Sequence, residues 1–209
     1  MDVIVLTSGG IDSAVVCKLI EKQSDKILPL FIDYGQLAAE KEWIACQNIM
    51  KDCNLPLPEK MDVRGYGKVI PSGLTSSDKH IYEDAFLPGR NLLFLTLASS
   101  YAASKKIKAI AIGLLTEKTH LFPDQTEEFI VNTNFAINSA LGDSFMILTP
   151  LIKFSKSDVI KLAEKYGIPL DKTYSCHSGK EKYCGKCVAC KEILGSELKH
   201  KIPQLGECD

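Results

Sequence analysis

The sequence predicts an α/β fold, with a parallel five-stranded sheet covered by helices on both faces. Three observations predict it. Strand-like and helix-like segments alternate along the chain. The strand-like segments are almost entirely apolar, which is typical of parallel strands buried on both faces. The chain has 209 residues, 45% of them hydrophobic, which suits one globular domain with a substantial core.

The alternation is regular in the first part of the chain. The run VIVLT predicts a first strand at residues 3–7, and residues 12–21 predict a helix with an apolar inner face. A second strand is expected at residues 26–35 and ends in a turn glycine. A helix near residues 37–51 and a third strand at residues 55–63 follow.

The second part continues the alternation after one interruption. Residues 64–88 are rich in Gly, Ser, Pro and charged residues, so we expect an irregular segment that passes over the active face. A buried helix is then expected at residues 91–106, a strand at 108–116, a helix at 126–141 and a fifth strand at 145–151.

A further helix is expected after the fifth strand. Ser155 is a typical N-cap residue, with Asp158 three residues later. Gly167 is typical of the position just beyond the end of a helix. These signals predict a helix that begins at Ser155 and ends before Gly167.

Charge and hydropathy narrow the class of protein. The net charge is −1, and residues 152–209 hold 11 lysines and 8 acidic residues. The excess of three positive charges in this part of the chain is small compared with the positive charge of nucleic-acid-binding surfaces, so we expect a small-molecule substrate. No apolar run approaches the ~20 residues of a membrane helix, and the N-terminus lacks the basic region of a signal peptide. We therefore expect a soluble cytoplasmic protein.

The stretch LTSGGIDSAVV, residues 6–16, lies between the first strand and the first helix. Ligands of parallel sheets bind outside the carboxyl ends of the strands. Here adjacent glycines let successive N–H groups point inward, Ser8 and Ser13 add hydroxyls, and the helix near Asp12 presents its positive dipole end. The stretch therefore predicts a cradle for phosphate or pyrophosphate. An ordinary strand–helix turn is the alternative for the two glycines alone.

The string SGGIDS also resembles the PP-loop signature SGG-x-D-S of the ATP pyrophosphatase superfamily. Its members cleave ATP between the α and β phosphates and transfer AMP to a substrate oxygen. The resemblance implies that seven consecutive residues bind ATP: Thr7, Ser8, Gly9, Gly10, Ile11, Asp12 and Ser13. Of these, Asp12 and Ser13 are expected to be catalytic, and Asp12 helps to hold Mg²⁺ or fixes the loop.

Four of the eight cysteines lie close together near the C-terminus. Seven residues separate Cys176 from Cys184, and two residues separate Cys184 from Cys187 and Cys187 from Cys190. Four thiolates with this spacing suit one tetrahedral metal ion with no open position, so we expect one structural Zn²⁺ per chain. An iron–sulfur cluster, a disulfide pair, or His177 in place of one cysteine are the alternatives. The other cysteines are expected to be buried apolar residues or, near the C-terminus, a free thiol: Cys17, Cys46, Cys53 and Cys208.

The loop and the cysteines together resemble the 7-cyano-7-deazaguanine synthases of the queuosine pathway. The likeness spans nearly the whole chain and includes five further strings: FIDYGQ at 31–36, PGRNLLFL at 88–95, FPDQTEEF at 122–129, TPL at 149–151 and CGKCVACK at 184–191. It implies an adenine nucleotide α-hydrolase-like fold. Residues 1–170 form the PP-loop ATP pyrophosphatase domain, and residues 171–209 form a zinc-binding segment packed on it.

The resemblance also implies a reaction. These enzymes adenylate the carboxylate of 7-carboxy-7-deazaguanine, and ammonia displaces AMP to give an amide. A second ATP activates the amide oxygen, and loss of AMP leaves the nitrile. An ATP-dependent C–N ligase that uses ATP, Mg²⁺ and Zn²⁺ is therefore implied, and we expect a homodimer.

The resemblance also implies that six residues outside the loop bind nucleotide or substrate. They are Asp33 and Gln36 for ATP, and Tyr34, Arg90, Asn91 and Asp124 for substrate. Arg90 is expected to pair with a carboxylate or phosphate and to be catalytic. Asp124 is the candidate for the guanine-like N–H edge. The local alternatives are a turn at residues 33–35, a surface ion pair for Arg90 and a helix cap for Asp124.

Two segments depart from the family pattern. In the first segment, family members usually have the sequence Gly-Tyr-Pro-Asp-Cys-Arg, and in this chain Gln125 and Thr126 replace its cysteine and arginine. In the second segment, residues 174–179 have the sequence YSCHSG, whereas the usual family pattern is Thr-Cys-Tyr-x-Gly. Both segments lie where substrate contacts are expected. One alternative is a related enzyme of an anti-phage system, which stops at the amide or joins the acyl group to a protein amine. A PP-loop tRNA-modifying enzyme and a non-catalytic zinc module are the others.

Overall fold

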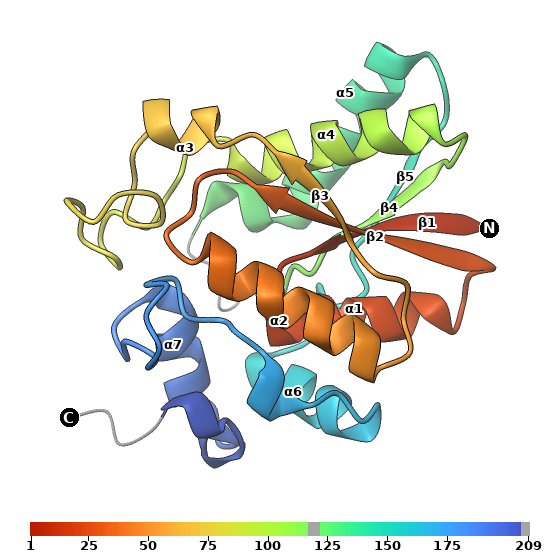
Figure 1. Cartoon of the computed structure of the whole chain (residues 1–209). Helices are drawn as coiled ribbons and strands as arrows, with labels where there is room; N and C mark the ends of the chain where they lie inside the picture. The colour runs from red at the N-terminus through yellow and green to blue at the C-terminus, as the bar shows by residue number, and fades with distance from the viewer. Residues whose placement is uncertain (117–121, 206–209) are drawn as a thin grey trace.

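The computed structural model describes residues 1–116 and 122–205, and these residues form one sheet of five parallel strands (Figure 1). The strands are β1 (Asp2–Thr7), β2 (Lys26–Asp33), β3 (Glu59–Asp62), β4 (Ala109–Ala111) and β5 (Met146–Leu148). Their order across the sheet is β3-β2-β1-β4-β5, and every neighbouring pair is parallel. The predicted sheet is confirmed. Cys208 lies outside the described residues.

Helices cover both faces of the sheet, as predicted. One face carries α1 (Ile11–Glu21), α2 (Ala39–Asp52) and α6 (Lys156–Lys165), and the other carries α4 (Arg90–Ser104) and α5 (Glu127–Leu141) (Figure 1). Alternate residues of β1 supply the two cores, because successive side chains of a strand point to opposite faces. Val3 and Val5 pack on the first side, and Ile4 and Leu6 on the second.

The shorter elements are where sequence and structure differ. The segment predicted to be irregular contains a short helix, α3 (Gly65–Val69), and α7 (Val188–Leu194) lies among the cysteines, where no helix was predicted. The remaining elements are single 3₁₀ turns: η1 (Pro123–Gln125), η2 (Leu170–Lys172), η3 (Lys199–Lys201) and η4 (Pro203–Leu205). Strand β3 begins four residues later than predicted, after Pro56 and Pro58, which lack the N–H that a sheet requires.

The topology creates a crevice at the carboxyl ends of the strands. The chain moves outward from β1 to β2 and β3, and then returns to place β4 beside β1. Connections therefore leave β1 and β4 in opposite directions, which opens the crevice where ligands bind in such sheets. Residues 64–89 and helix α7 both lie at this end of the sheet (Figure 1). The prediction that residues 64–88 pass over the active face is confirmed, since Leu74 and Ala85 line the cavity there.

The cysteine-rich segment shares its core with the sheet. Cys190, Ile193 and Ile202 are buried in the same apolar cluster as Val15 of α1 and Ile49 of α2. Burial of this kind fixes the segment against α1 and α2 through the hydrophobic effect. Among the described residues, no helix has the length and apolar character needed to cross a membrane.

The start of α6 has the predicted cap. The Ser155 hydroxyl accepts a hydrogen bond from the Asp158 N–H at 3.3 Å, and the Asp158 carboxylate accepts one from the Ser155 N–H at 3.0 Å. This reciprocal pair satisfies two N–H groups at a helix end. Gly167 follows the helix with φ +66°, as expected for the residue that terminates it.

Loss of this cap should destabilise the fold measurably. We expect Ser155→Ala to lower the free energy of unfolding by about 1 kcal/mol, because an N–H at the start of α6 loses its partner. Ser144→Ala, at an exposed position in a loop, is the control and should change it by less than about 0.5 kcal/mol. Urea unfolding followed by circular dichroism measures both. Equal effects of the two substitutions would contradict the prediction.

Candidate active site and metal centre

The loop between β1 and α1 is a tight structure built around Gly9. Gly9 has φ +79°, and a Cβ atom there would lie 2.3 Å from the Glu42 carbonyl oxygen. Only glycine suits that position. The Ser13 hydroxyl donates to the Gly10 carbonyl at 3.1 Å and accepts from the Ser8 N–H at 3.2 Å. No side chain caps α1, so its first N–H groups keep the capacity to bind an anion.

A cavity of about 270 Å³ lies at the carboxyl ends of β1, β2 and β4. It brings together ten of the thirteen predicted ATP-binding, substrate-binding and catalytic residues: Thr7, Ser8, Gly10, Ile11, Asp12, Ser13, Tyr34, Gln36, Arg90 and Asn91. Residues from the loop, from β2 and from α4 thus meet in one place. A concave site of this kind, with a few convergent polar groups, is typical of small-molecule binding sites.

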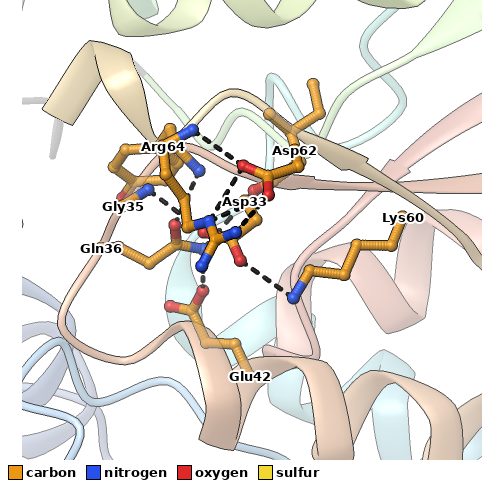
Figure 2. A network of polar contacts seen from close by, with 9 residues as sticks. Asp33, Gly35, Gln36, Glu42, Lys60, Asp62 and Arg64 are labelled. Atoms are coloured by element: carbon orange, nitrogen blue, oxygen red, sulfur yellow. Dashed lines mark hydrogen bonds and ion pairs between the residues drawn. The ribbon is translucent and has the colours of Figure 1, made fainter.

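Three predicted residues lie beside the cavity and not on its wall. Gly9 is buried behind the loop. The Asp33 carboxylate accepts a hydrogen bond from the Gly35 N–H at 3.2 Å and pairs with Lys60 at 2.9 Å (Figure 2). The Asp124 carboxylate accepts a hydrogen bond from the Asn91 N–H at 3.2 Å, near the start of α4. The ligand contacts of these residues remain predictions.

The turn after β2 is fixed by a network of polar contacts (Figure 2). The Gln36 side chain accepts from the Tyr34 N–H at 3.0 Å and donates to Glu42 at 2.9 Å. At the end of β3, Arg64 donates to both carboxylate oxygens of Asp62. The network therefore holds Tyr34 and Gln36 in place at the edge of the cavity.

Glu42 is a cavity residue that the sequence analysis missed. Burial raises its pKa to about 7, an effect opposed by the hydrogen bond from Gln36 and the positive charge of Arg90. Such a carboxyl group can hold or release a proton near neutral pH. Its position on the first turns of the helix after β2 was the available signal, because that end of the helix faces the carboxyl edge of the sheet.

Arg90 and Tyr34 present polar groups to the same cavity. The Arg90 Nε is buried without a hydrogen-bond partner, and its guanidinium lies 5.9 Å from the centre of the Phe94 ring. A buried donor without a partner is costly, so this group is suited to an anionic ligand. Burial raises the pKa of Tyr34 to about 12, and its phenol therefore stays protonated.

Lys156 is the most consequential residue that the sequence analysis missed. Its Nζ lies 2.7 Å from both carboxylate oxygens of Asp12 and 3.4 Å from Glu192. Its side chain is 10% exposed and lines the cavity beside the loop. Burial favours the neutral amine, but the two carboxylates raise the pKa of Lys156 above its usual value. The site therefore holds a fixed positive charge, which is suited to phosphate.

The four clustered cysteines form a site that can hold a metal ion. The sulfur atoms of Cys176, Cys184, Cys187 and Cys190 all lie within 4.8 Å of one another. Backbone N–H groups donate to these sulfurs, including Cys184 to Cys176 at 3.2 Å and Cys187 to Cys184 at 3.3 Å. Hydrogen bonds from Cys187 and Cys190 lower the pKa of the Cys176 thiol. Donors aimed at sulfur stabilise the thiolates that metal binding requires.

His177 lies beside this cluster and lines the cavity instead of joining the four sulfurs. Burial and the positive charge of Arg90 lower its pKa to about 4, so the imidazole is neutral. Its Nδ1 is buried without a hydrogen-bond partner. The cysteine segment therefore contributes to the wall of the cavity as well as to the metal centre.

The chain is similar to known proteins over nearly its whole length. A family model described as "Queuosine biosynthesis protein QueC" matches residues 2–194. A protein of Campylobacter hominis named 7-cyano-7-deazaguanine synthase is 30% identical, over 98% of this chain and 100% of that protein. Another of that name from Nautilia profundicola is 31% identical, over 96% of each chain.

A solved structure shares the fold. It is described as a "predicted subunit of tRNA methyltransferase" from Methanocaldococcus jannaschii, and it superposes with a TM-score of 0.54. The two chains are 20% identical, and the match covers 78% of this chain and 74% of that one. This likeness supports the α/β architecture alone.

Removal of one clustered cysteine should cost both metal and stability. We expect Cys187→Ala to lower the bound metal well below one ion per chain and the free energy of unfolding by more than about 2 kcal/mol, because metal binding is coupled to folding. Elemental mass spectrometry and urea unfolding measure the two quantities. Cys53→Ala is the control, since Cys53 is buried outside the cluster and should leave metal content unchanged. A stable, metal-free wild-type protein would refute the metal centre.

Proposed function

Because the chain belongs to the QueC family of queuosine biosynthesis proteins, we propose that it is an ATP-dependent ligase acting on 7-carboxy-7-deazaguanine. The product of the full reaction is 7-cyano-7-deazaguanine. The observation that carries the proposal is the convergence of the SGGIDS loop, Lys156 and Arg90 on one cavity. That arrangement offers two anion-binding regions, one for the phosphates of ATP and one for a carboxylate.

The proposed reaction proceeds in two activations. The carboxylate oxygen attacks the α-phosphorus of ATP and releases pyrophosphate, and ammonia then displaces AMP to give the primary amide. The amide oxygen attacks a second ATP and again releases pyrophosphate. Loss of AMP and two protons from the adenylated amide leaves the nitrile. Each adenylation converts a poor leaving group into a good one.

The loop and Lys156 act on the phosphates in this proposal. Ser8, Gly10 and Ser13 provide N–H and hydroxyl groups for the leaving pyrophosphate. Lys156 moves from Asp12 toward the bridging oxygen and stabilises the charge that develops there. Asp12 is then available to help hold Mg²⁺, which supplies further charge neutralisation when ATP is bound.

The other side of the cavity holds the deazaguanine acid. Arg90 pairs with its carboxylate, and Tyr34 and Phe94, whose ring centres lie 5.2 Å apart, provide an aromatic wall for the ring. In this proposal Asp124 acts through Asn91, to whose N–H it is bound, and Asp33 acts through the turn that carries Tyr34. Thr7, Ile11 and Gln36 line the nucleotide side.

We propose zinc for the cysteine cluster. Sulfurs bound to one Zn²⁺ at about 2.3 Å lie no more than about 4.6 Å apart, and the four sulfurs of this site all lie within 4.8 Å of one another. In an iron–sulfur cluster the cysteines bind different irons, which places their sulfurs farther apart. The separation favours a single ion.

Gln125 supports the second candidate, in which the acyl group passes to another amine. Gln125 lines the cavity, whereas the Thr126 hydroxyl accepts a hydrogen bond from the Phe129 N–H at 3.0 Å and caps α5. Of the two family departures in that segment, only Gln125 lines the cavity in which we propose that the substrate binds. A changed wall at that point can admit an amine larger than ammonia or release the amide early.

Product analysis tests the proposed function. With 7-carboxy-7-deazaguanine, ATP, Mg²⁺ and ammonia, we expect AMP and pyrophosphate together with the amide, the nitrile or both. Mass spectrometry identifies the products, and reactions without acid or without ammonia are the controls. Amide without nitrile, or a protein conjugate when candidate amines are added, supports the second candidate. No ATP-dependent consumption of the acid would refute the substrate assignment.

Lys156 should be essential to ATP cleavage. We expect Lys156→Ala to lower the rate of pyrophosphate release by about 100-fold or more, because the positive charge at the leaving group is lost. Ser13→Ala should act in the same direction. Lys153→Ala, at an exposed lysine three residues away, is the matched control and should keep the wild-type rate. Pyrophosphate release near the wild-type rate in Lys156→Ala would rule out this role.

A further inference from the structure

Lys156 has a second carboxylate partner, and that partner comes from the cysteine segment. Glu192 Oε2 lies 3.4 Å from Lys156 Nζ, and Glu192 is half-buried in the wall of the cavity. Asp12 approaches the same ammonium group from α1. The lysine is therefore held between two elements that are far apart in the sequence.

The helix that carries Glu192 is itself fixed by the cysteine cluster. Helix α7 begins after Cys187, whose sulfur accepts a hydrogen bond from the Cys190 N–H at 3.5 Å. Both cysteines belong to the four-sulfur group. Ile193, next to Glu192, is fully buried in the core. The position of Glu192 therefore depends on the cluster and on the packing around it.

The two carboxylates have different roles when ATP binds. Asp12 belongs to the loop that receives the phosphates, so its contact with Lys156 competes with the phosphates for the same ammonium group. Glu192 lies outside the loop, on a separate helix, and can keep its contact while Lys156 turns to the leaving group. Fixing a lysine side chain in one position costs conformational entropy. A partner that already holds the side chain in place when ATP binds avoids that cost at the catalytic step.

We propose that Glu192 is a positioning residue that holds Lys156 at the loop and so makes ATP cleavage depend on the cysteine cluster. This inference rests on the proposed function, because it needs ATP to bind at the loop. It gives the metal centre a role beyond stability: the cluster sets the place of α7, α7 carries Glu192, and Glu192 orients the lysine.

Kinetics of Glu192 variants test the positioning role. We expect Glu192→Ala to lower kcat for pyrophosphate release about 10-fold with less than a 3-fold change in KM for ATP, since the lysine acts mainly in the transition state. Glu192→Gln, which keeps an acceptor oxygen, should lose less. Glu197→Ala, at an exposed glutamate just after α7, is the matched control. Unfolding free energy and metal content should stay near wild type in all three.

A double-mutant cycle shows whether Glu192 acts through Lys156. In the Lys156→Ala background, Glu192→Ala should lower kcat by less than about 2-fold, because the group that it positions is already gone. A full 10-fold loss in that background overturns the proposal. So does an unchanged kcat in Glu192→Ala alone.

Chemical labelling provides a readout independent of activity. Without Glu192, the Lys156 amine loses one of its two ion-pair partners and is less restrained, so acetic anhydride should acetylate it at least about 3-fold faster than in wild type, with Lys153 as the internal reference. Peptide mass spectrometry measures the rates. Metal removal by a chelator should speed labelling of Lys156 in wild type but not further in Glu192→Ala. Unchanged wild-type labelling after chelation would overturn the link to the cluster.

Different results would refute the proposed function and the positioning role of Glu192. If wild type does not bind α,β-methylene ATP in calorimetry, the proposed function fails. If wild type binds and cleaves ATP but the Glu192 variants match it in kcat and in Lys156 labelling, only the positioning role fails.

Discussion

The parallel pairing of β1 with both β2 and β4 is the constraint on which the rest of the structure depends. It places β1 at the centre of the sheet, buried on both faces. The strands that follow β1 are added on one side of it and the strands from β4 onward on the other side. The loop that follows β1 therefore opens into the crevice between diverging connections. Leu74 and Ala85 from the segment after β3, and His177 and Glu192 from the cysteine segment, line the same cavity as that loop.

Electrostatics then defines what the crevice can hold. One ammonium group lies between two carboxylates, and a guanidinium Nε without a partner lies on the other side of the cavity. In a partly buried site such charges interact more strongly than in water. The ammonium group is suited to phosphate, and the guanidinium is suited to a carboxylate or a phosphate. The arrangement therefore suits a reaction that brings a triphosphate and a carboxylate together.

The cysteine segment contributes to the wall of the cavity as well as to the core. It supplies Ser175, His177 and Glu192 to the cavity wall and Ile193 to the core. Four sulfurs with backbone N–H donors close the segment into a compact unit. Family membership covers nearly the whole chain, yet Gln125 lies in the cavity wall at a position where the family pattern differs.

The sequence by itself determined the order of the strands and of the longer helices, the parallel sheet, the glycine-rich loop after β1 and the cysteine cluster, because the signal for each lies in a short stretch of the chain. Apolar periodicity, adjacent glycines and C-x₂-C spacing are local signals. Helix α7 escaped prediction because its seven residues are too few for a clear amphipathic period. Only the tertiary structure decided that Lys156 meets both Asp12 and Glu192, and that Asp124 binds the Asn91 N–H beside the cavity. Those contacts join residues up to 144 positions apart, and the packing of the helices and the cysteine segment around the sheet brings them within hydrogen-bonding distance.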